Sequence, residues 1–170
     1  MAKLEVLHFL DPRLRKKAVT IETIDNNIRN IADDMLETMY DEGGIGLAAT
    51  QVNIQQRLVV IDVSEDRNQP DVLINPEIID TDGTEQMQEG CLSVPGYYDD
   101  VERAKKIKYS YLTVDGENIT QEASDLLSVC IQHEIDHLNG ILFIDYLSPL
   151  KRRRLLKRID KQEKLQTLPL

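Results

Sequence analysis

The segment QHEIDHLNG, residues 132–140, constrains this chain more than any other feature. It lies in an apolar stretch that Ser124 or Asp125 can cap as a helix, and its final glycine suits a helix end. Residues four apart share one face of a helix, so His133 and His137 can bind one metal ion. Two ligands do not complete a catalytic site, which usually has three from the protein. The fold must therefore bring a third ligand to this helix.

Three residues are candidates for that third ligand. Cys130 shares the face of His133, but at ~1.5 Å per residue it lies ~10 Å along the axis from His137, so we interpret it as a residue that lines a pocket. His8 lies in an N-terminal apolar run, where a packed or surface histidine is the usual interpretation. We prefer Cys91, because it lies in a glycine-flanked stretch between predicted strands, from which a ligand can point at a helix.

The patterns along the rest of the chain predict an α+β fold, with antiparallel or mixed sheets packed around a central metal-binding helix. An N-terminal and a C-terminal helix complete it, and the dipeptide Asn75-Pro76 predicts a bulged or edge strand. The predicted elements are a helix over 25–40, a tight glycine-rich loop over 43–50, strands over 56–63 and 72–79, a hairpin over 101–122 that turns at Asp115-Gly116, the helix that ends at Asn139-Gly140, and a last helix that begins at Ser148-Pro149.

Composition excludes several classes of protein. The chain has 170 residues, of which 41% are hydrophobic and 29% charged, proportions typical of one packed domain. It has only two cysteines, and its N-terminus lacks the apolar stretch of a secretory signal, so we expect reduced thiols and a cytoplasmic protein. No apolar run approaches the length of a membrane span, so we expect no membrane partner, and we take a monomer as the default.

Charge is distributed unevenly along the chain. The net charge is −10, but residues 151–164 carry eight Lys or Arg against two acidic residues, so this segment is +6 and the remainder −16. We therefore divide the single domain into residues 1–147, which carry the catalytic groups, and residues 148–170, a basic helix and tail. The simplest interpretation of the basic segment is a solvated helix that packs on the body through Leu155, Leu156 and Ile159.

Three stretches together resemble the signature motifs of the peptide deformylases, in the same order along the chain. They are GIGLAATQ (residues 44–51), EGCLS (residues 89–93) and QHEIDHLNG (residues 132–140). The resemblance also includes the leading helix and the basic C-terminal helix. It implies a metal-dependent hydrolase that removes the N-formyl group from the initiator methionine of nascent polypeptides and releases formate.

The resemblance also assigns roles to single residues. It implies that Cys91, His133 and His137 bind one divalent metal ion, with water in the fourth position. Glu134 is then the general base that activates this water for attack on the formyl carbon, and afterwards the acid that protonates the departing amine. The family favours Fe²⁺, although a cysteine with two histidines also accepts Zn²⁺, Ni²⁺ or Co²⁺.

The same resemblance predicts how substrate is held. The side-chain amide of Gln51 and the backbone N–H of Leu92 would stabilise the oxyanion of the tetrahedral intermediate. An extended peptide would lie along nearby backbone as an added strand does. The backbone residues are Gly44, Ile45, Gly46 and Gly90, and those around the methionine side chain are Ile45, Met87, Leu126, Val129, Cys130 and His133.

Two further expectations concern partners and specificity. In bacterial deformylases with this extension the basic helix resembles a ribosome-docking element, so residues 149–164 are predicted to meet ribosomal RNA phosphates. Tyr98 falls where some family members have an arginine near the rim of the substrate groove. Contacts beyond the first substrate residue therefore cannot be carried over from the family.

Two other functions compete with this interpretation. In the longer pattern of one H-E-x-x-H peptidase class, Phe143 stands where the third histidine belongs, and Glu163 is only a weak candidate for the glutamate of another class. An RNA-binding factor with a structural metal would need four closed protein ligands, and only three convincing ones are present.

Overall fold

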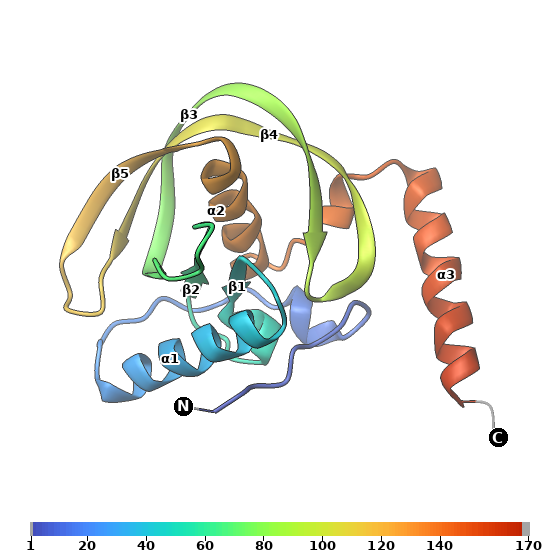
Figure 1. The fold of residues 1–170 in the computed structure, drawn as a ribbon, viewed down its shortest axis with the longest axis horizontal. Coiled ribbons are helices and arrows are strands. Elements are labelled where there is room, and N and C mark those ends of the chain that lie inside the picture. Colours follow the sequence, from blue (N-terminus) through green and yellow to red (C-terminus); the bar gives the residue numbers. More distant parts are fainter. Residues whose placement is uncertain (1, 168–170) are drawn as a thin grey trace.

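The computed structural model describes residues 2–167, and side chains as far as residue 162. This part of the chain forms five strands and three α-helices, joined by short 3-10 helices (Figure 1), which confirms the predicted α+β class. In chain order the elements are η1 (Pro12–Arg15), α1 (Asn26–Asp41), β1 (Gly46–Ala48), η2 (Ala49–Val52), β2 (Leu58–Ile61), β3 (Asp71–Cys91), β4 (Val94–Leu112), β5 (Asn118–Ser124), α2 (Asp125–Leu138), η3 (Phe143–Tyr146) and α3 (Pro149–Thr167).

The strands form one sheet in the order β1-β2-β3-β4-β5, and each neighbouring pair is antiparallel. The long strands β3 and β4 arch over α2 as a curved hairpin (Figure 1). The predicted bulge is confirmed, because the register shifts between Ile74 and Glu77, where Asn75 has a φ of 51°. Strand β1 stands at one edge of the sheet, so none of the described strands pairs with its outer side.

Two segments predicted as irregular are in fact strands. Strand β3 continues past residue 79 to Cys91, because β4 pairs with it along this length, and residues 79–88 are too exposed to show the alternation of a half-buried strand. Leu47 and Ala48, which fell in the predicted glycine-rich loop, belong to β1. They pair with Val60 and Val59 of β2 and are fully buried.

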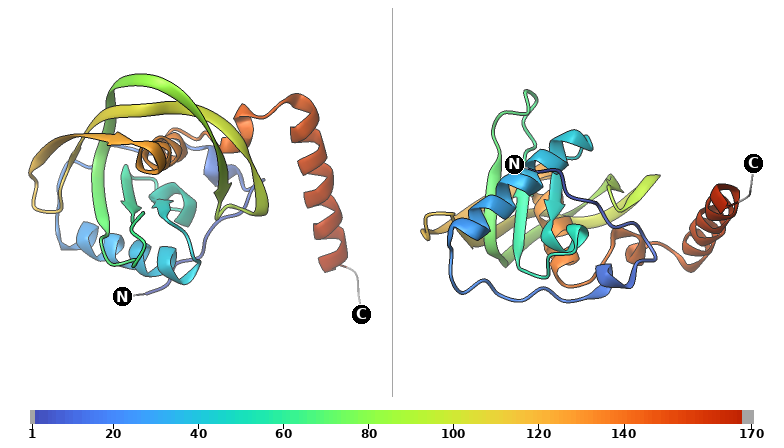
Figure 2. Two further views of the ribbon diagram at one scale, coloured as in Figure 1. Left: turned by 45° about the horizontal axis from the view of Figure 1, so that its top comes forward. Right: turned by 90° about the horizontal axis from the view of Figure 1, so that it is seen from below.

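Two helices cover opposite faces of β2, which explains why the sequence LVVI is buried at every position. On one face, Leu58 and Val60 pack in a cluster with Met35 of α1. On the other, Val59 and Ile61 pack in a cluster with α2 (Figure 2). The sheet therefore lies between α1 and α2, and α2 is the central helix that the sequence predicted.

Helix α2 has the predicted limits, but side-chain capping does not start it. Ser124 occupies the N-cap position, yet its side chain makes no capping hydrogen bond. At the other end Gly140 has a φ of 77°, and a Cβ there would collide with the carbonyl oxygen of Arg15. Eight of the fourteen residues of α2 are buried, so packing rather than capping stabilises this helix.

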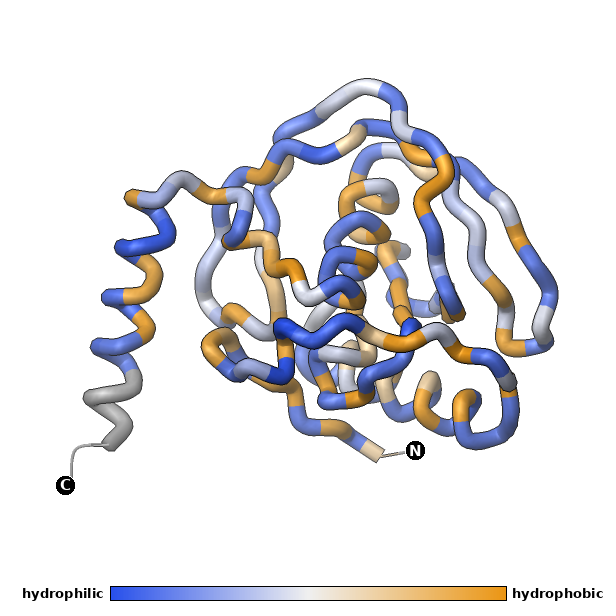
Figure 3. The backbone as a smooth tube through the Cα atoms, turned by 180° about the vertical axis from the view of Figure 1, so that it is seen from behind, coloured by the Kyte–Doolittle hydropathy of each residue, from blue (hydrophilic) through white to orange (hydrophobic). Residues whose placement is uncertain are grey.

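Helix α3 extends away from the body of the protein (Figures 1 and 3). Leu155 is buried and Ile159 packs beside it, whereas Leu156 is 42% exposed, so two of the three apolar residues predicted to pack do so. Lys151 Nζ also lies 3.0 Å from Asp99 Oδ1 on β4. No helix in the described part of the chain is long and apolar enough to cross a membrane.

Candidate active site

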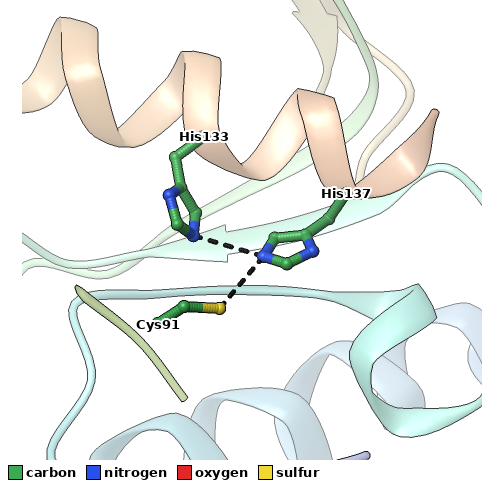
Figure 4. A group of neighbouring side chains, drawn as sticks. All are labelled: Cys91, His133 and His137. Carbon is green, nitrogen blue, oxygen red and sulfur yellow. Dashed lines mark hydrogen bonds between the residues drawn. The ribbon is translucent and has the colours of Figure 1, made fainter. Parts of the chain in front are cut away.

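Three side chains converge where the end of β3 meets α2 (Figure 4). His133 and His137 project from one face of α2, and their Nε2 atoms lie 3.2 Å apart. Cys91, the last residue of β3, points its Sγ to within 3.3 Å of His137 Nε2. The three potential ligand atoms all lie within 4.8 Å of one another. The fold thus brings together the three residues that the sequence singled out as metal ligands.

The spacing of these atoms fits a tetrahedral metal ion. Ligand nitrogens at 2.0–2.1 Å from such an ion are about 3.4 Å apart, and a sulfur at 2.3 Å is about 3.5 Å from each nitrogen. The observed separations of 3.2 and 3.3 Å are close to these values. A donor set of two imidazole nitrogens and one sulfur suits zinc, iron, nickel or cobalt. The residues present therefore fit one divalent ion.

The protonation state of His137 is also suited to metal binding. The ring is fully buried, and burial, followed by the charges of His133 and Arg103, lowers the pKa of His137 well below 6.5. Its neutral form is the one that binds a metal. The backbone of α2 is held at this point, because Thr50 Oγ1 donates a hydrogen bond to the His137 carbonyl oxygen.

Glu89 holds the other imidazole in place. Its Oε1 lies 2.8 Å from His133 Nδ1, which leaves His133 Nε2 free to face the site. Burial alone raises the pKa of Glu89, but hydrogen bonds from His133 and Arg103 outweigh it and hold this pKa below its usual value. Partners of this kind orient metal-binding histidines. Sequence reasoning missed Glu89 because it treated this stretch as a loop, whereas strand alternation would place Glu89 on the same face as Cys91.

A buried ion pair extends this arrangement away from the site. Arg103 on β4 contacts both carboxylate oxygens of Glu89, at 2.6 and 3.0 Å, and reaches Asp136 Oδ2 at 2.7 Å. Tyr146 donates a hydrogen bond to the same Asp136 oxygen at 2.7 Å. Removing one partner of a buried pair typically costs ~3–5 kcal/mol. These residues therefore fix His133 through contacts between strands, helix and η3.

Glu134 lies beside the three potential ligands but is not one of them. The residue is 3% exposed, and its Oε1 has no hydrogen-bond partner in the described part of the chain. Burial raises the pKa of Glu134 to about 7. Its Oε2 faces Gly46 so closely that a Cβ at Gly46 would collide with it. A buried carboxylate that is available for proton transfer is the arrangement that acid–base catalysis uses.

Gln51 presents its amide nitrogen to the site. Its Oε1 accepts a hydrogen bond from Ala48 N at 2.9 Å, so its Nε2 faces the other way, 3.0 Å from Ser93 Oγ and 3.5 Å from Cys91 Sγ. Leu92 lies in the tight turn between β3 and β4, and no described group accepts its backbone N–H. Two hydrogen-bond donors therefore stand next to Cys91.

A cavity of about 560 Å³ opens onto these groups. Met87, which was predicted to surround the methionine side chain, is not among the residues that line this cavity. The other predicted residues do contribute to its walls. They are Gly44, Ile45, Gly46, Gln51, Gly90, Cys91, Leu92, Leu126, Val129, Cys130, His133 and Glu134.

The remaining candidates fall outside the group of potential ligands. Cys130 is buried at the cavity wall and His8 is exposed at its border, and neither belongs to the cluster of three. Phe143, at the position where the longer peptidase pattern has its third histidine, is buried and packs on His133, with the ring centres 6.0 Å apart. Tyr98 lines the rim and is 63% exposed. The side chain of Glu163 lies outside the described residues.

Comparison with known proteins gives one consistent result. The profile of the family described as Polypeptide deformylase matches residues 3–153. The peptide deformylase of Pseudoalteromonas translucida is 60% identical over 164 residues, which cover 96% of this chain and 98% of that protein. A peptide deformylase from Legionella pneumophila superimposes with a TM-score of 0.92 at 45% identity, covering 99% and 100% of the two chains. One from Ehrlichia chaffeensis, in complex with actinonin, gives 0.91 at 39% identity, covering 96% and 99%.

Proposed function

Because the chain belongs to the polypeptide deformylase family, we propose that Cys91, His133 and His137 hold the divalent ion on which this family depends. The protein is a metal-dependent hydrolase that removes the formyl group from formyl-methionyl nascent peptides. The convergence of one sulfur and two imidazole nitrogens beside the buried carboxylate of Glu134 is the observation that supports these assignments.

Glu134 is proposed as the group that moves protons. When bound, a divalent ion lowers the pKa of a water molecule and polarises the carbonyl group that is attacked. Glu134 takes the proton from the attacking water and then gives it to the amine nitrogen, which leaves poorly as an anion. Its carboxylate suits this role because it is buried, follows His133 directly in α2, and has one oxygen to which no described residue makes a hydrogen bond.

Gln51 and Leu92 are proposed to bind the oxyanion that forms when the formyl carbon becomes tetrahedral. The Gln51 amide is already oriented by Ala48 and Ser93, so it need not reorganise during the reaction. The N–H of Leu92 has no acceptor among the described residues and is available for the same oxygen. Each donor that is fixed in advance in this way commonly lowers the free-energy barrier by ~3–4 kcal/mol.

The cavity is proposed to take the methionine side chain of the substrate. Its walls include Ile45, Leu126, Val129 and Cys130, and the ring of His133. Leu126, Val129 and Cys130 share a face of α2, which supports a common apolar wall. The backbone of residues 44–46 and Gly90 is proposed to lie beside the extended peptide.

Removing the metal should abolish formate release. We propose Fe²⁺ as the native ion, with Zn²⁺, Ni²⁺ or Co²⁺ also accepted. Protein treated with a chelator and reloaded without oxygen should recover formate release from a formyl-methionyl peptide with Fe²⁺, and lose it again on exposure to air. Each ion is added in turn, and the number of bound ions per protein molecule is measured. Formate release that survives complete chelation would contradict the metal assignment.

Ribosome docking through α3 is a separate proposal, which rests on the basic charge of residues 149–164. It treats residues 148–170 as a basic helix and tail that follow the catalytic residues 1–147. A chain ending at Pro149 should cosediment with ribosomes at least ~10-fold less at moderate salt, because phosphate contacts dominate such binding. Since Leu155 packs on the body, a second variant replaces the exposed Arg152, Arg153 and Arg154 with glutamine. Formate release from free peptide is the control and should not change. Undiminished cosedimentation of both variants would refute docking through α3.

We also propose that the protein acts as a monomer in the cytoplasm. What supports the cytoplasm is that Cys91 and Cys130 are both free thiols in the structure, whereas a monomer is the default for a chain of one domain.

A further inference from the structure

The glycine-rich segment 43–46 forms part of the cavity wall, and its two ends are held by neighbouring elements. The N–H groups of Gly43 and Gly44 donate to carbonyl oxygens at the end of α1, and Gly46 pairs with Ile61 of β2. Three of its four residues are glycines, and Ile45 is 36% exposed. Glycine backbone adopts many conformations unless it is held by other groups. The shape of this wall must therefore be set by residues outside it.

Arg67 supplies one such contact from the connection between β2 and β3. Its Nη2 donates a hydrogen bond to the Gly44 carbonyl oxygen at 2.5 Å, and its guanidinium lies 5.2 Å from the ring centre of Tyr40. This connection lies beside the end of α1 (Figure 2). Arg67 has a φ of 57°, a strained value for a residue other than glycine. Such strain persists only where surrounding contacts hold the backbone.

Asp62 anchors this connection to the same wall. Its buried carboxylate accepts hydrogen bonds from Tyr40 Oη at 2.6 Å, Ser64 N at 2.9 Å and Gln69 N at 3.1 Å. Its own backbone N–H donates to the Ile45 carbonyl oxygen at 2.9 Å. The connection and the glycine-rich segment are therefore one hydrogen-bonded unit, although Asp62 follows Ile45 by 17 positions along the chain.

We propose that Arg67 is a positioning residue for substrate binding, which holds the 43–46 wall ready for the backbone of an extended peptide. Because a peptide unit is planar, fixing the Gly44 carbonyl also fixes the direction of the Ile45 N–H. No described group accepts that N–H, so it is available to a ligand. Arg67 does not line the cavity, and it acts only through this wall. The inference rests on the proposed function, in which substrate lies beside this segment.

Replacing Arg67 with methionine tests the proposal. A wall that is held in advance lowers the ordering cost of binding, so its loss should weaken binding more than chemistry. We expect KM for a formyl-methionyl tripeptide to rise about tenfold, the amount typical of one charge-assisted hydrogen bond, with kcat within about twofold of the parent. Arg67→Lys keeps the charge without the planar fork, so it should restore only part of the loss.

Arg29 provides a matched control. Its Nη2 also donates to a backbone carbonyl, that of Val114 at 3.0 Å, but neither residue lines the cavity. Arg29→Met should leave KM unchanged. An unchanged KM in Arg67→Met would overturn the proposal, and so would a loss of kcat that equals the loss of bound metal. If Arg67→Met does not fold, the same two criteria are applied to Arg67→Lys. A parent enzyme that releases no formate would refute the proposed function instead.

Discussion

Replacing Glu134 with alanine should lower kcat for formate release from a formyl-methionyl peptide by about a thousandfold, because a positioned acid–base group contributes that order of acceleration. Glu134 is the buried carboxylate beside the potential ligands, and no described residue makes a hydrogen bond to its Oε1. No other described carboxylate in the cavity wall is free for this role: Glu89 is paired with Arg103, and Glu42 lies within reach of Lys3 at the protein surface.

The loss must be separated from loss of the fold or of the metal. Removing a buried carboxylate that lacks a full set of partners should not destabilise the protein, so the Tm of Glu134→Ala should equal or exceed that of the parent. Its metal content should also match the parent. Glu134→Gln keeps the shape of the side chain without the base and should be equally impaired. Equal rates for parent and Glu134→Ala would refute the proton-transfer role.

Replacing Cys91 with alanine should remove the ion and reduce formate release by a hundredfold or more. Two histidines alone form an incomplete site, and loss of an orienting partner alone typically costs 10- to 100-fold in affinity. The number of bound metal ions per protein molecule is measured after dialysis against a weak chelator. In cobalt-loaded protein the absorption that arises from charge transfer between thiolate and metal should disappear.

Cys130 is the matched control for this experiment. It is the other free cysteine and lies near the cavity, but its Sγ faces the Ile45 carbonyl at 3.9 Å and is not among the potential ligands. Cys130→Ala should keep both the ion and the cobalt–thiolate absorption, whatever its effect on KM. Loss of the ion from Cys130→Ala with retention in Cys91→Ala would reverse the assignment.

Much of the site could be predicted because its spacing is local. The helical period alone places His133 and His137 on one face, and apolar patterning together with Gly140 gives the limits of α2. The bulge at Asn75 and the turn at Gly116, where φ is 84°, were likewise readable from residue type. In each case the signal depends on a few neighbouring residues.

Other elements could not be predicted, because partners distant in the sequence create them. Strand β3 reaches Cys91 only because β4 pairs with it, and its exposed residues carry no periodic signal. The pair between Glu89 and Arg103 arises from the same hairpin. Arg67 lies in a polar connection, where its contact with Gly44 left no trace in the pattern.

The sequence by itself determined that a helix carries two histidines and a glutamate arranged for a metal, together with the motifs that identify the family. Only the tertiary structure decided that Cys91, 46 positions before His137, arrives within 3.3 Å of it, and that Glu89 fixes the ring of His133. The reason is physical. Helix geometry is set by hydrogen bonds between residues four apart, whereas convergence of distant side chains depends on how the sheet curves and packs over that helix.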